Sequence, residues 1–354
     1  MKIALITDTH WGVRNDNIAF MDNSKRFLDE VFFPYLDNNN VRTVVHLGDL
    51  VDRRKYINIR TASRLRQDFL EPLANGEYDV HFIAGNHDTY FKNTNSVNAL
   101  QELVVDKYPF KVYDQLPREV EFDGTIILML PWICDENRQL CLDKIRSTPA
   151  QIVMGHLELA GFEMYRGSMV SHGDDRKLFD RFDMVISGHY HHRSSDGSIH
   201  YLGSHAEFTW SDYDDCKGFH ILDTETRELT FIENPYRMFA KVWYDDTSEG
   251  TKNAGVDIDS LKGMNVKVIV TNKTDPYRFD MFINQIEKVG ALSMQVVDDH
   301  LNLHMEEDTD IVNEAESTLQ IFKNHIDQIT TKNIDKKKLE LTITELYQEA
   351  LTVE

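Results

Sequence analysis

Within the first 191 residues, five short polar clusters each follow directly on an apolar run. The clusters are Asp8-Thr9-His10, Gly48-Asp49-Leu50-Val51-Asp52, Gly85-Asn86-His87-Asp88, Gly155-His156 and Gly188-His189-Tyr190-His191. Short runs rich in isoleucine and valine that end at Gly, Asp or Asn are typical of buried strands. Since polar side chains at the carboxyl ends of such strands form the sites of α/β proteins, the pattern predicts one site built from all five clusters.

Strand-like and helix-like segments alternate up to about residue 235. The apolar runs lie at residues 3–6, 41–47, 80–84, 126–130, 152–154, 184–186, 199–202, 219–222 and 229–232. Helical patterns at residues 22–38 and 61–74 separate the early runs, whereas only turns separate the late ones. This arrangement predicts a mixed α/β sandwich rather than one all-parallel sheet.

The pattern changes near residue 236. Strand patterns at residues 266–270 and 294–297 flank a helical pattern at 277–289, which predicts a small α+β module. From about residue 308 two helical patterns each carry one apolar stripe. The stripes consist of Leu319, Phe322, Ile326 and Ile329, and of Leu339, Ile343, Leu346 and Ala350. We therefore expect three parts, residues 1–235, 236–305 and 306–354.

Composition disfavours one mode of DNA binding and indicates a compartment. The chain has 59 acidic and 38 basic residues, a net charge of −21, whereas proteins that hold DNA by overall charge are basic. Cys134, Cys141 and Cys216 are too few and too irregular for a disulfide framework or a thiolate zinc site. The apolar start is too short for a signal peptide, and no run is long enough to span a membrane. We expect a cytoplasmic protein in a reducing environment.

The clusters supply carboxylates, imidazoles and one amide, but no thiolate. This donor set suits Mn²⁺, Mg²⁺, Fe²⁺ or Zn²⁺. The donors are numerous enough for two ions that share a bridging ligand. Two ions about 3.5–4 Å apart form a clamp for phosphoester displacement, so the clusters predict phosphoester chemistry.

The order of the clusters resembles the calcineurin-like metallophosphoesterase superfamily. Asp8-Thr9-His10-Trp11-Gly12, Tyr201-Leu202-Gly203-Ser204 and Lys217-Gly218 further resemble SbcD-type double-strand-break nucleases. A likeness to the recombination endonuclease subunits of T-even-type bacteriophages covers nearly the whole chain, including Pro131-Trp132, Ser171-His172-Gly173 and residues 219–226 and 265–271. The resemblance implies a four-layer α/β/β/α sandwich with a small α+β capping domain and C-terminal helices.

The same resemblance implies two divalent ions, with Mn²⁺ preferred and Mg²⁺ as the alternative. The implied ligands are Asp8, His10 and His191 for one ion, Asn86, His156 and His189 for the other, and Asp49 as the bridge. His87 would face the substrate instead of ligating, and would stabilise the phosphorane and protonate the leaving oxygen.

Asp52 departs from the family pattern. Cellular nucleases of this kind often have a histidine four residues after the glycine of the second cluster, where this chain has Asp52. An aspartate donates a proton at neutral pH only if its pKa is raised. Asp52 is therefore a candidate catalytic acid or, alternatively, a carboxylate that orients a ligand histidine.

A basic stretch begins directly after Asp52. Arg53, Arg54 and Lys55 start it, and no acidic residue follows before Gln67. It predicts either a patch that binds substrate phosphates or an ordinary solvated helix face.

Histidines outside the clusters have a separate interpretation. We expect structural or surface roles for His46, His81, His200, His220, His300, His304 and His325. His192 should point away from the site, because neighbours in an extended segment face opposite ways. His172 and His205 are candidates for lining the cleft.

The resemblance implies a metal-dependent DNA nuclease, a 3′–5′ exonuclease and endonuclease. It would act with an SMC-like ATPase of the SbcC type in recombination, double-strand-break repair and DNA end processing. The C-terminal helices would bind that ATPase, unless they pack on their own chain. The resemblance also implies a homodimer, with residues 61–73 and 96–105 as candidate surfaces.

Two other functions remain open from the sequence. The same clusters serve small-molecule metallophosphoesterases, such as cyclic-nucleotide phosphodiesterases, and phosphoprotein phosphatases. A non-catalytic scaffold or DNA-end-binding subunit is the third alternative, although it would not need the complete ligand set.

Overall fold

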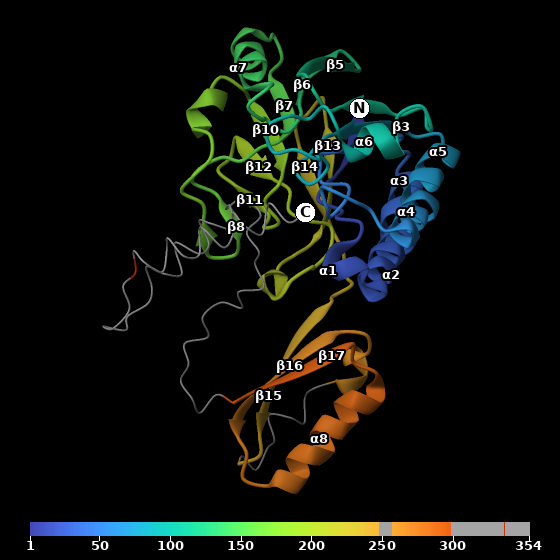
Figure 1. Cartoon of the computed structure of the whole chain (residues 1–354), viewed down its shortest axis with the longest axis vertical. Coiled ribbons are helices and arrows are strands. Elements are labelled where there is room, and N and C mark those ends of the chain that lie inside the picture. The colour runs from blue at the N-terminus through green and yellow to red at the C-terminus, as the bar shows by residue number, and fades with distance from the viewer. Residues whose placement is uncertain (248–256, 299–335, 337–354) are drawn as a thin grey trace. The chain divides into compact units, whose positions relative to one another are not determined.

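The computed structural model describes residues 1–247, 257–298 and 336, and its main body contains two six-stranded sheets (Figure 1). The strands of the first sheet are β1 (Lys2–Ile6), β2 (Thr43–His46), β3 (Asp79–Ile83), β4 (Lys111–Tyr113), β13 (Gly218–Asp223) and β14 (Leu229–Glu233). Their order is β14-β13-β1-β2-β3-β4. The strands β1 to β4 are parallel, and β13 is antiparallel to both of its neighbours.

The second sheet is also mixed. Its strands are β5 (Arg118–Phe122), β6 (Thr125–Leu130), β7 (Ile152–His156), β10 (Met184–Gly188), β11 (Ser194–Ser195) and β12 (Ile199–Tyr201). They lie in the order β11-β12-β10-β7-β6-β5, with the four central strands parallel. A separate two-stranded hairpin consists of β8 (Glu163–Tyr165) and β9 (Ser168–Met169).

The two sheets pack face to face, and helices cover their outer faces. One buried cluster joins Leu5 and Val45 of the first sheet to Met154 and Ile186 of the second. The first sheet is covered by α2 (Ile18–Phe27), α3 (Phe33–Asn38), α4 (Ile59–Leu65), α5 (Glu71–Asn75) and α6 (Ala99–Leu103), and the second by α7 (Arg138–Ser147). The predicted mixed α/β sandwich is confirmed.

Two long helical segments, predicted at residues 22–38 and 61–74, each contain a wider π-helical turn. The turns are η1 (Leu28–Phe32) and η2 (Arg66–Leu70). The residue that follows each turn donates its backbone N–H to the carbonyl five residues earlier. Phe33 donates to Leu28, and Glu71 donates to Arg66. A proline follows within two residues, and since proline has no N–H it cannot continue the regular hydrogen-bond ladder.

The predicted α+β module is present and contains one strand more than expected. A parallel three-stranded sheet of β15 (Phe239–Asp245), β16 (Asn265–Asn272) and β17 (Ser293–Asp298) buries one face against α8 (Pro276–Val289). The Asp275 side chain caps α8 by accepting from the N–H groups of Tyr277 and Arg278. The sequence pattern missed β15, because Lys241 and the half-exposed Trp243 interrupt its apolar residues.

Some expectations lie outside the described residues. The chain divides into two compact units, residues 1–304 and 305–354, and the paired helices predicted after residue 308 fall in the second. His300, His304 and His325 also lie outside the described part. Among the helices of residues 1–247 and 257–298, none has the length and apolarity needed to cross a membrane.

Candidate metal centre

The predicted clusters meet at the carboxyl ends of parallel strands. Asp8 and His10 follow β1, Asp49 and Asp52 follow β2, Asn86 and His87 follow β3, His156 ends β7, and His189 and His191 follow β10. The first three strands belong to one sheet and the last two to the other. The site therefore lies where the ends of the two packed sheets converge.

Four of the predicted ligand residues have a left-handed backbone. The φ angle is 51° at Asp8, 41° at His10, 56° at Asp49 and 85° at His189. Residues other than glycine seldom adopt this conformation, and it clusters at functional sites, where the surrounding structure offsets its cost. The left-handed backbone at these four positions places the predicted ligand side chains.

Two glycines allow the clusters to approach one another. A Cβ on Gly85 would lie 2.2 Å from Asp49 Oδ1, and one on Gly188 would lie 2.1 Å from Thr7 Oγ1. Both separations are far inside van der Waals contact. The first residue of each of these two clusters must therefore be glycine, so that the loop can pack against its neighbour.

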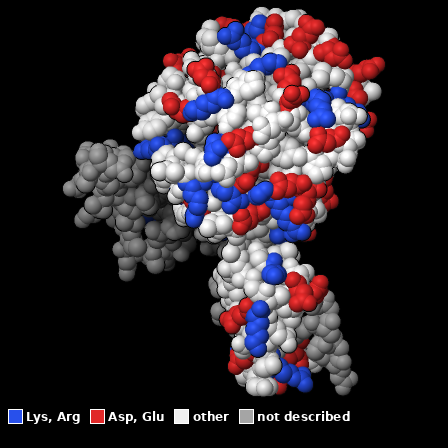
Figure 2. Space-filling model, turned by 90° about the vertical axis from the view of Figure 1, so that its right-hand side faces the viewer, with Lys and Arg blue, Asp and Glu red and all other residues white. Residues whose placement is uncertain are grey.

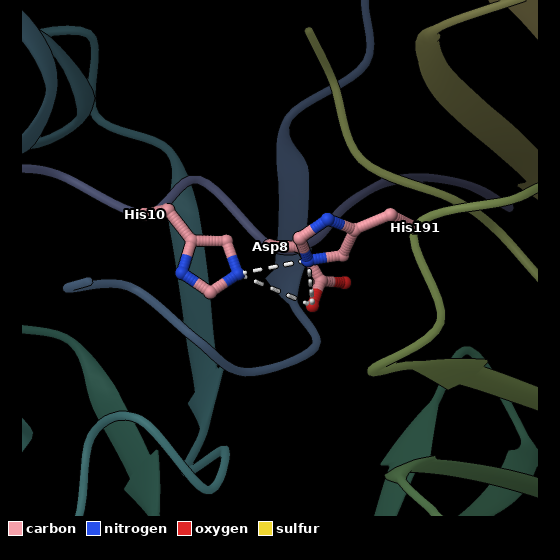
Figure 3. A group of neighbouring side chains, drawn as sticks. All are labelled: Asp8, His10 and His191. Atoms are coloured by element: carbon pink, nitrogen blue, oxygen red, sulfur yellow. Dashed lines mark hydrogen bonds and ion pairs between the residues drawn. The ribbon is translucent and has the colours of Figure 1, made fainter. Parts of the chain in front are cut away.

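Asp8, His10 and His191 form a first group of converging side chains (Figure 3). His10 Nε2 lies 3.0 Å from His191 Nε2 and 3.9 Å from Asp8 Oδ1, while His191 Nε2 lies 3.8 Å from the same oxygen. The Thr7 hydroxyl donates to Asp8 Oδ2 at 2.7 Å, and the His189 backbone N–H donates to Asp8 Oδ2 at 3.1 Å. These bonds hold the Asp8 carboxylate toward the two rings.

Asn86, His156 and His189 form a second group. Asn86 Oδ1 lies 3.0 Å from both His156 Nε2 and His189 Nδ1. His156 Nδ1 donates to the Leu47 carbonyl at 2.8 Å, which orients the ring so that Nε2 faces Asn86. With Asp49, the two histidines can hold a metal ion.

Asp49 lies between the two groups. Its Oδ2 is 3.2 Å from His156 Nε2 and 3.7 Å from His10 Nε2, and its Oδ1 accepts from the His87 backbone N–H at 2.8 Å. Burial alone would raise the pKa of Asp49, but the neighbouring His156 and His87 outweigh it and hold the pKa well below its ordinary value. An ionised carboxylate therefore occupies the predicted bridging position.

The protonation of the histidines fits divalent cations. Burial lowers the pKa of His10, His189 and His191, so these rings are neutral near pH 7 and offer lone pairs. At His156 burial also acts to lower the pKa, but Asp49 outweighs it and raises the pKa to about 9. Near pH 7 His156 therefore carries a proton that balances the negative charge of Asp49. A metal ion bound there would replace this proton.

Asp52 contacts two histidines of the site. Its backbone carbonyl accepts from His87 Nδ1 at 2.5 Å, and its carboxylate Oδ1 lies 3.6 Å from His10 Nδ1, too far for a hydrogen bond. The His87 ring meets the His10 ring edge-on, with centroids 4.7 Å apart. His87 also forms a potential metal-binding group with His10 and Asp49, so the geometry alone permits it to ligate.

Asp88 cross-links the second and third clusters, a role that the sequence pattern did not reveal. Its Oδ2 accepts from the N–H groups of Asp49 at 2.9 Å and Gly85 at 2.8 Å, and its Oδ1 accepts from Leu50 at 2.8 Å and Val51 at 3.2 Å. Burial, with the nearby Asp49 charge, raises the pKa of Asp88 to about 7. The only sequence signal was an aspartate directly after a proposed catalytic histidine.

Lys217 supports the segment that carries His191, a role that the Lys217-Gly218 motif did not reveal. Its buried ammonium donates to the His191 backbone carbonyl at 2.7 Å and pairs with Asp212 at 2.7 Å and Asp215 at 2.9 Å. Burial alone would lower the pKa of Lys217, but the two carboxylates outweigh it and raise the pKa. The lysine therefore remains charged and fixes the chain that carries His191.

The predicted basic patch is partly paired with acidic side chains. Arg53 Nη1 lies 2.8 Å from Asp16, while Arg54 is half-buried and Lys55 is exposed. The later pairs are Arg64 with Asp22 and Asp68, and Arg66 with Glu71. On the face displayed in Figure 2, basic and acidic side chains are interspersed. Arg53 would have to leave Asp16 to bind a phosphate.

The remaining described histidines mostly follow expectation. His46, His81 and His220 are buried and His200 is half-buried. His192 pairs with Asp215 at 3.1 Å and belongs to neither metal-binding group. The prediction for His205 was wrong, since it is 1% exposed and packs against Phe27 and Phe208.

Comparison with known proteins agrees with the order of the clusters. The family described as calcineurin-like phosphoesterase matches residues 1–193, which include all five clusters. Exonuclease subunit 1 of Enterobacteria phage T4 is 32% identical over 356 residues, covering 99% of this chain and 99% of that protein. The SbcD subunit of the SbcCD nuclease of Staphylococcus saprophyticus is 25% identical over 386 residues, again with 99% coverage of both.

A further relative is the SbcD subunit of the SbcCD nuclease of Staphylococcus epidermidis. It is 24% identical over 274 residues, covering 66% of this chain and 69% of that protein. Both the clusters and the full-length similarity lead to the same family. The chain belongs to the calcineurin-like phosphoesterases, within the group of SbcD-type nuclease subunits.

Proposed function

We propose that this chain is a two-metal DNA nuclease and the catalytic subunit of a complex with an SMC-like ATPase of the SbcC type. One observation carries the proposal. Five separate clusters bring seven potential ligands and His87 close together, in a chain whose full-length relatives are nuclease subunits. It would act in recombination, double-strand-break repair and DNA end processing.

Two divalent ions, Mn²⁺ before Mg²⁺, would be held by the predicted residues. These are Asp8, His10 and His191 for one, Asn86, His156 and His189 for the other, and Asp49 for both. When bound, such ions activate water and neutralise charge on the phosphate. The Asp52 carbonyl accepts from His87 Nδ1 and so orients the ring. When the ring is protonated on both nitrogens, His87 would donate its Nε2 proton to the leaving oxygen.

Three parts of the chain would divide the work. Residues 1–235 would form the nuclease domain, residues 236–305 a capping domain that recognises DNA, and residues 306–354 the helices that bind the ATPase. The separate buried cluster of Tyr244, Val268, Phe279 and Phe282 supports treating the second part as a structural unit. Arg53, Arg54 and Lys55 would contact DNA phosphates beside the site.

A homodimer belongs to the same proposal. Ile59 and Tyr56, beside the candidate surface at residues 61–73, are 89% and 63% exposed. Val97, within the other candidate surface at residues 96–105, is 45% exposed. Exposed apolar side chains next to both candidate surfaces support an interface there.

The test compares a linear DNA duplex with a cyclic dinucleotide, each with Mn²⁺ and with EDTA. The proposal predicts Mn²⁺-dependent cleavage of the duplex, with EDTA abolishing it. Cleavage of the cyclic dinucleotide alone would establish a small-molecule phosphodiesterase instead. No cleavage of either substrate would establish a non-catalytic subunit.

A further inference from the structure

A cavity of about 260 Å³ adjoins the metal centre. His156 lines it on the side of the second metal group, together with Trp132, which follows β6. Arg138 at the start of α7, Glu158 after β7 and Asp174 also line it. Because His156, a potential ligand, is part of its wall, whatever fills this cavity lies next to the second metal-binding group.

Trp132 provides a fixed aromatic wall. Its ring centroid lies 5.2 Å from that of His189 and 6.1 Å from that of His156. Its backbone N–H donates to Ala84 at 2.8 Å, and its carbonyl accepts from the side-chain amide of Asn95, also at 2.8 Å. The backbone that carries the ring is therefore fixed beside the two histidines.

The charged groups of the cavity disfavour an anion. Glu158 and Asp174 provide two carboxylates against the guanidinium of Arg138, which is itself paired with Asp174. Glu158 Oε1 is buried, and His172 Nε2 lies 3.1 Å from it, so a base would share this carboxylate with His172. A carboxylate of this kind accepts a hydrogen bond from the amino group of a base and repels a phosphate.

We propose that this cavity is a base pocket, which holds the nucleobase next to the phosphate that is cut. Trp132 packs against the face of the base, and Glu158 accepts from its amino group. The inference rests on the proposed nuclease function. Loss of the ring or of the base should each reduce kcat/KM about tenfold or more, which lies within the range that stacking of a base on an aromatic side chain supplies.

The experiment uses three DNA duplexes with the full-length protein and Mn²⁺. One duplex is intact, one has an abasic residue at the 3′ end, and one has it next to the end. For the wild type, one of the two abasic duplexes should have a kcat/KM about tenfold or more below the intact duplex. Trp132→Ala should lose a similar factor on the intact duplex but lose nothing more on that abasic duplex.

Additional variants separate recognition from support of the metal ligands. Trp132→Phe should retain most of the preference for the intact duplex, and Glu158→Ala should weaken it. Leu140→Ala, an exposed change on α7 outside the cavity, should match the wild type.

Three outcomes would count against the base pocket in different ways. If wild type cuts all three duplexes equally, the pocket is overturned while the nuclease function stands. If Trp132→Ala loses the same factor on every duplex and binds Mn²⁺ more weakly, Trp132 only supports the histidines. If wild type cuts no duplex, the nuclease function itself fails.

Discussion

At the scale of single residues, the site depends on side chains placed by strained backbone. Asp49 combines a left-handed φ of 56° with contacts to both metal-binding groups. Its position against Gly85 leaves no space for a methyl group there. Such residues hold the site together without contributing to the core, so their removal should affect activity more than folding.

Replacing Asp49 should therefore abolish activity without preventing folding. Asp49→Ala should abolish Mn²⁺-dependent cleavage, because it removes the one side chain that faces both groups. The variant should still unfold cooperatively, since the site lies at strand ends, although loss of the buried Asp49–His156 pair lowers its midpoint. The measurement pairs a cleavage assay with thermal unfolding in EDTA, and wild-type cleavage by the variant would overturn the bridging role.

His87 should behave differently from the ligands. His87→Ser should bind two Mn²⁺ ions and yet lose about 10²–10⁴-fold in rate, the range that general acid–base groups supply. Calorimetric titration with Mn²⁺ measures the stoichiometry alongside the rate. A variant that binds only one ion would make His87 a ligand, which its place near His10 and Asp49 also permits.

At the scale of elements, long-range polar contacts fix the loops that carry the ligands. Lys217, directly before β13, bonds the backbone of His191 after β10, and Asp88 after β3 binds the loop after β2. Neighbours in sequence do not reveal such pairings, because the partners lie 26 and 39 residues apart. The supporting roles of these two residues were therefore missed, although the ligands they support were predicted.

The same contrast applies to the strands. The central strands were predicted because burial on both faces gives continuous apolar runs, as in β7 and β10. The strands β4 and β5 were missed because they lie at sheet edges, where exposed positions such as Lys111 and Arg118 break the pattern. The clusters remained recognisable since each follows a central strand directly.

Lys217 provides the prediction at this scale. Lys217→Met leaves Asp212 and Asp215 buried without their cation, which should lower the free energy of unfolding by about 3–5 kcal/mol. Mn²⁺ affinity should fall about 10–100-fold, as for other supports of metal ligands. Denaturant unfolding and Mn²⁺ titration measure the two effects.

Two variants control for the lysine itself. Lys217→Arg keeps the charge and should lose less of both properties, and the exposed Lys177→Met should change stability by less than about 0.5 kcal/mol. If Lys217→Met is as stable and binds Mn²⁺ as well as the wild type, the buried pair does not hold the His191 segment.

At the scale of the whole molecule, we expect DNA cleavage and binding of the ATPase to depend on different parts of the chain. Removal of residues 308–354 should leave Mn²⁺-dependent cleavage of short DNA intact, since every described potential ligand lies before residue 192 and its support Lys217 lies before residue 218. Binding to the SbcC-type ATPase should be lost, because the apolar stripes of the two predicted helices are removed. Pull-down with the purified ATPase and a basal cleavage assay check both statements.

Two results for this truncation would contradict the docking hypothesis. An insoluble truncation, or one without basal cleavage, would mean that the predicted helices pack on their own chain. The docking hypothesis would then fail, while the metal centre would still stand on the geometry of its own residues.

Anomalous scattering from a Mn²⁺-soaked crystal would show whether one carboxylate joins two metal sites. Two anomalous peaks are expected about 3.5–4 Å apart, one beside Asp8, His10 and His191 and the other beside Asn86, His156 and His189, with Asp49 between them. A single peak, or two peaks of which Asp49 touches only one, would contradict its bridging role.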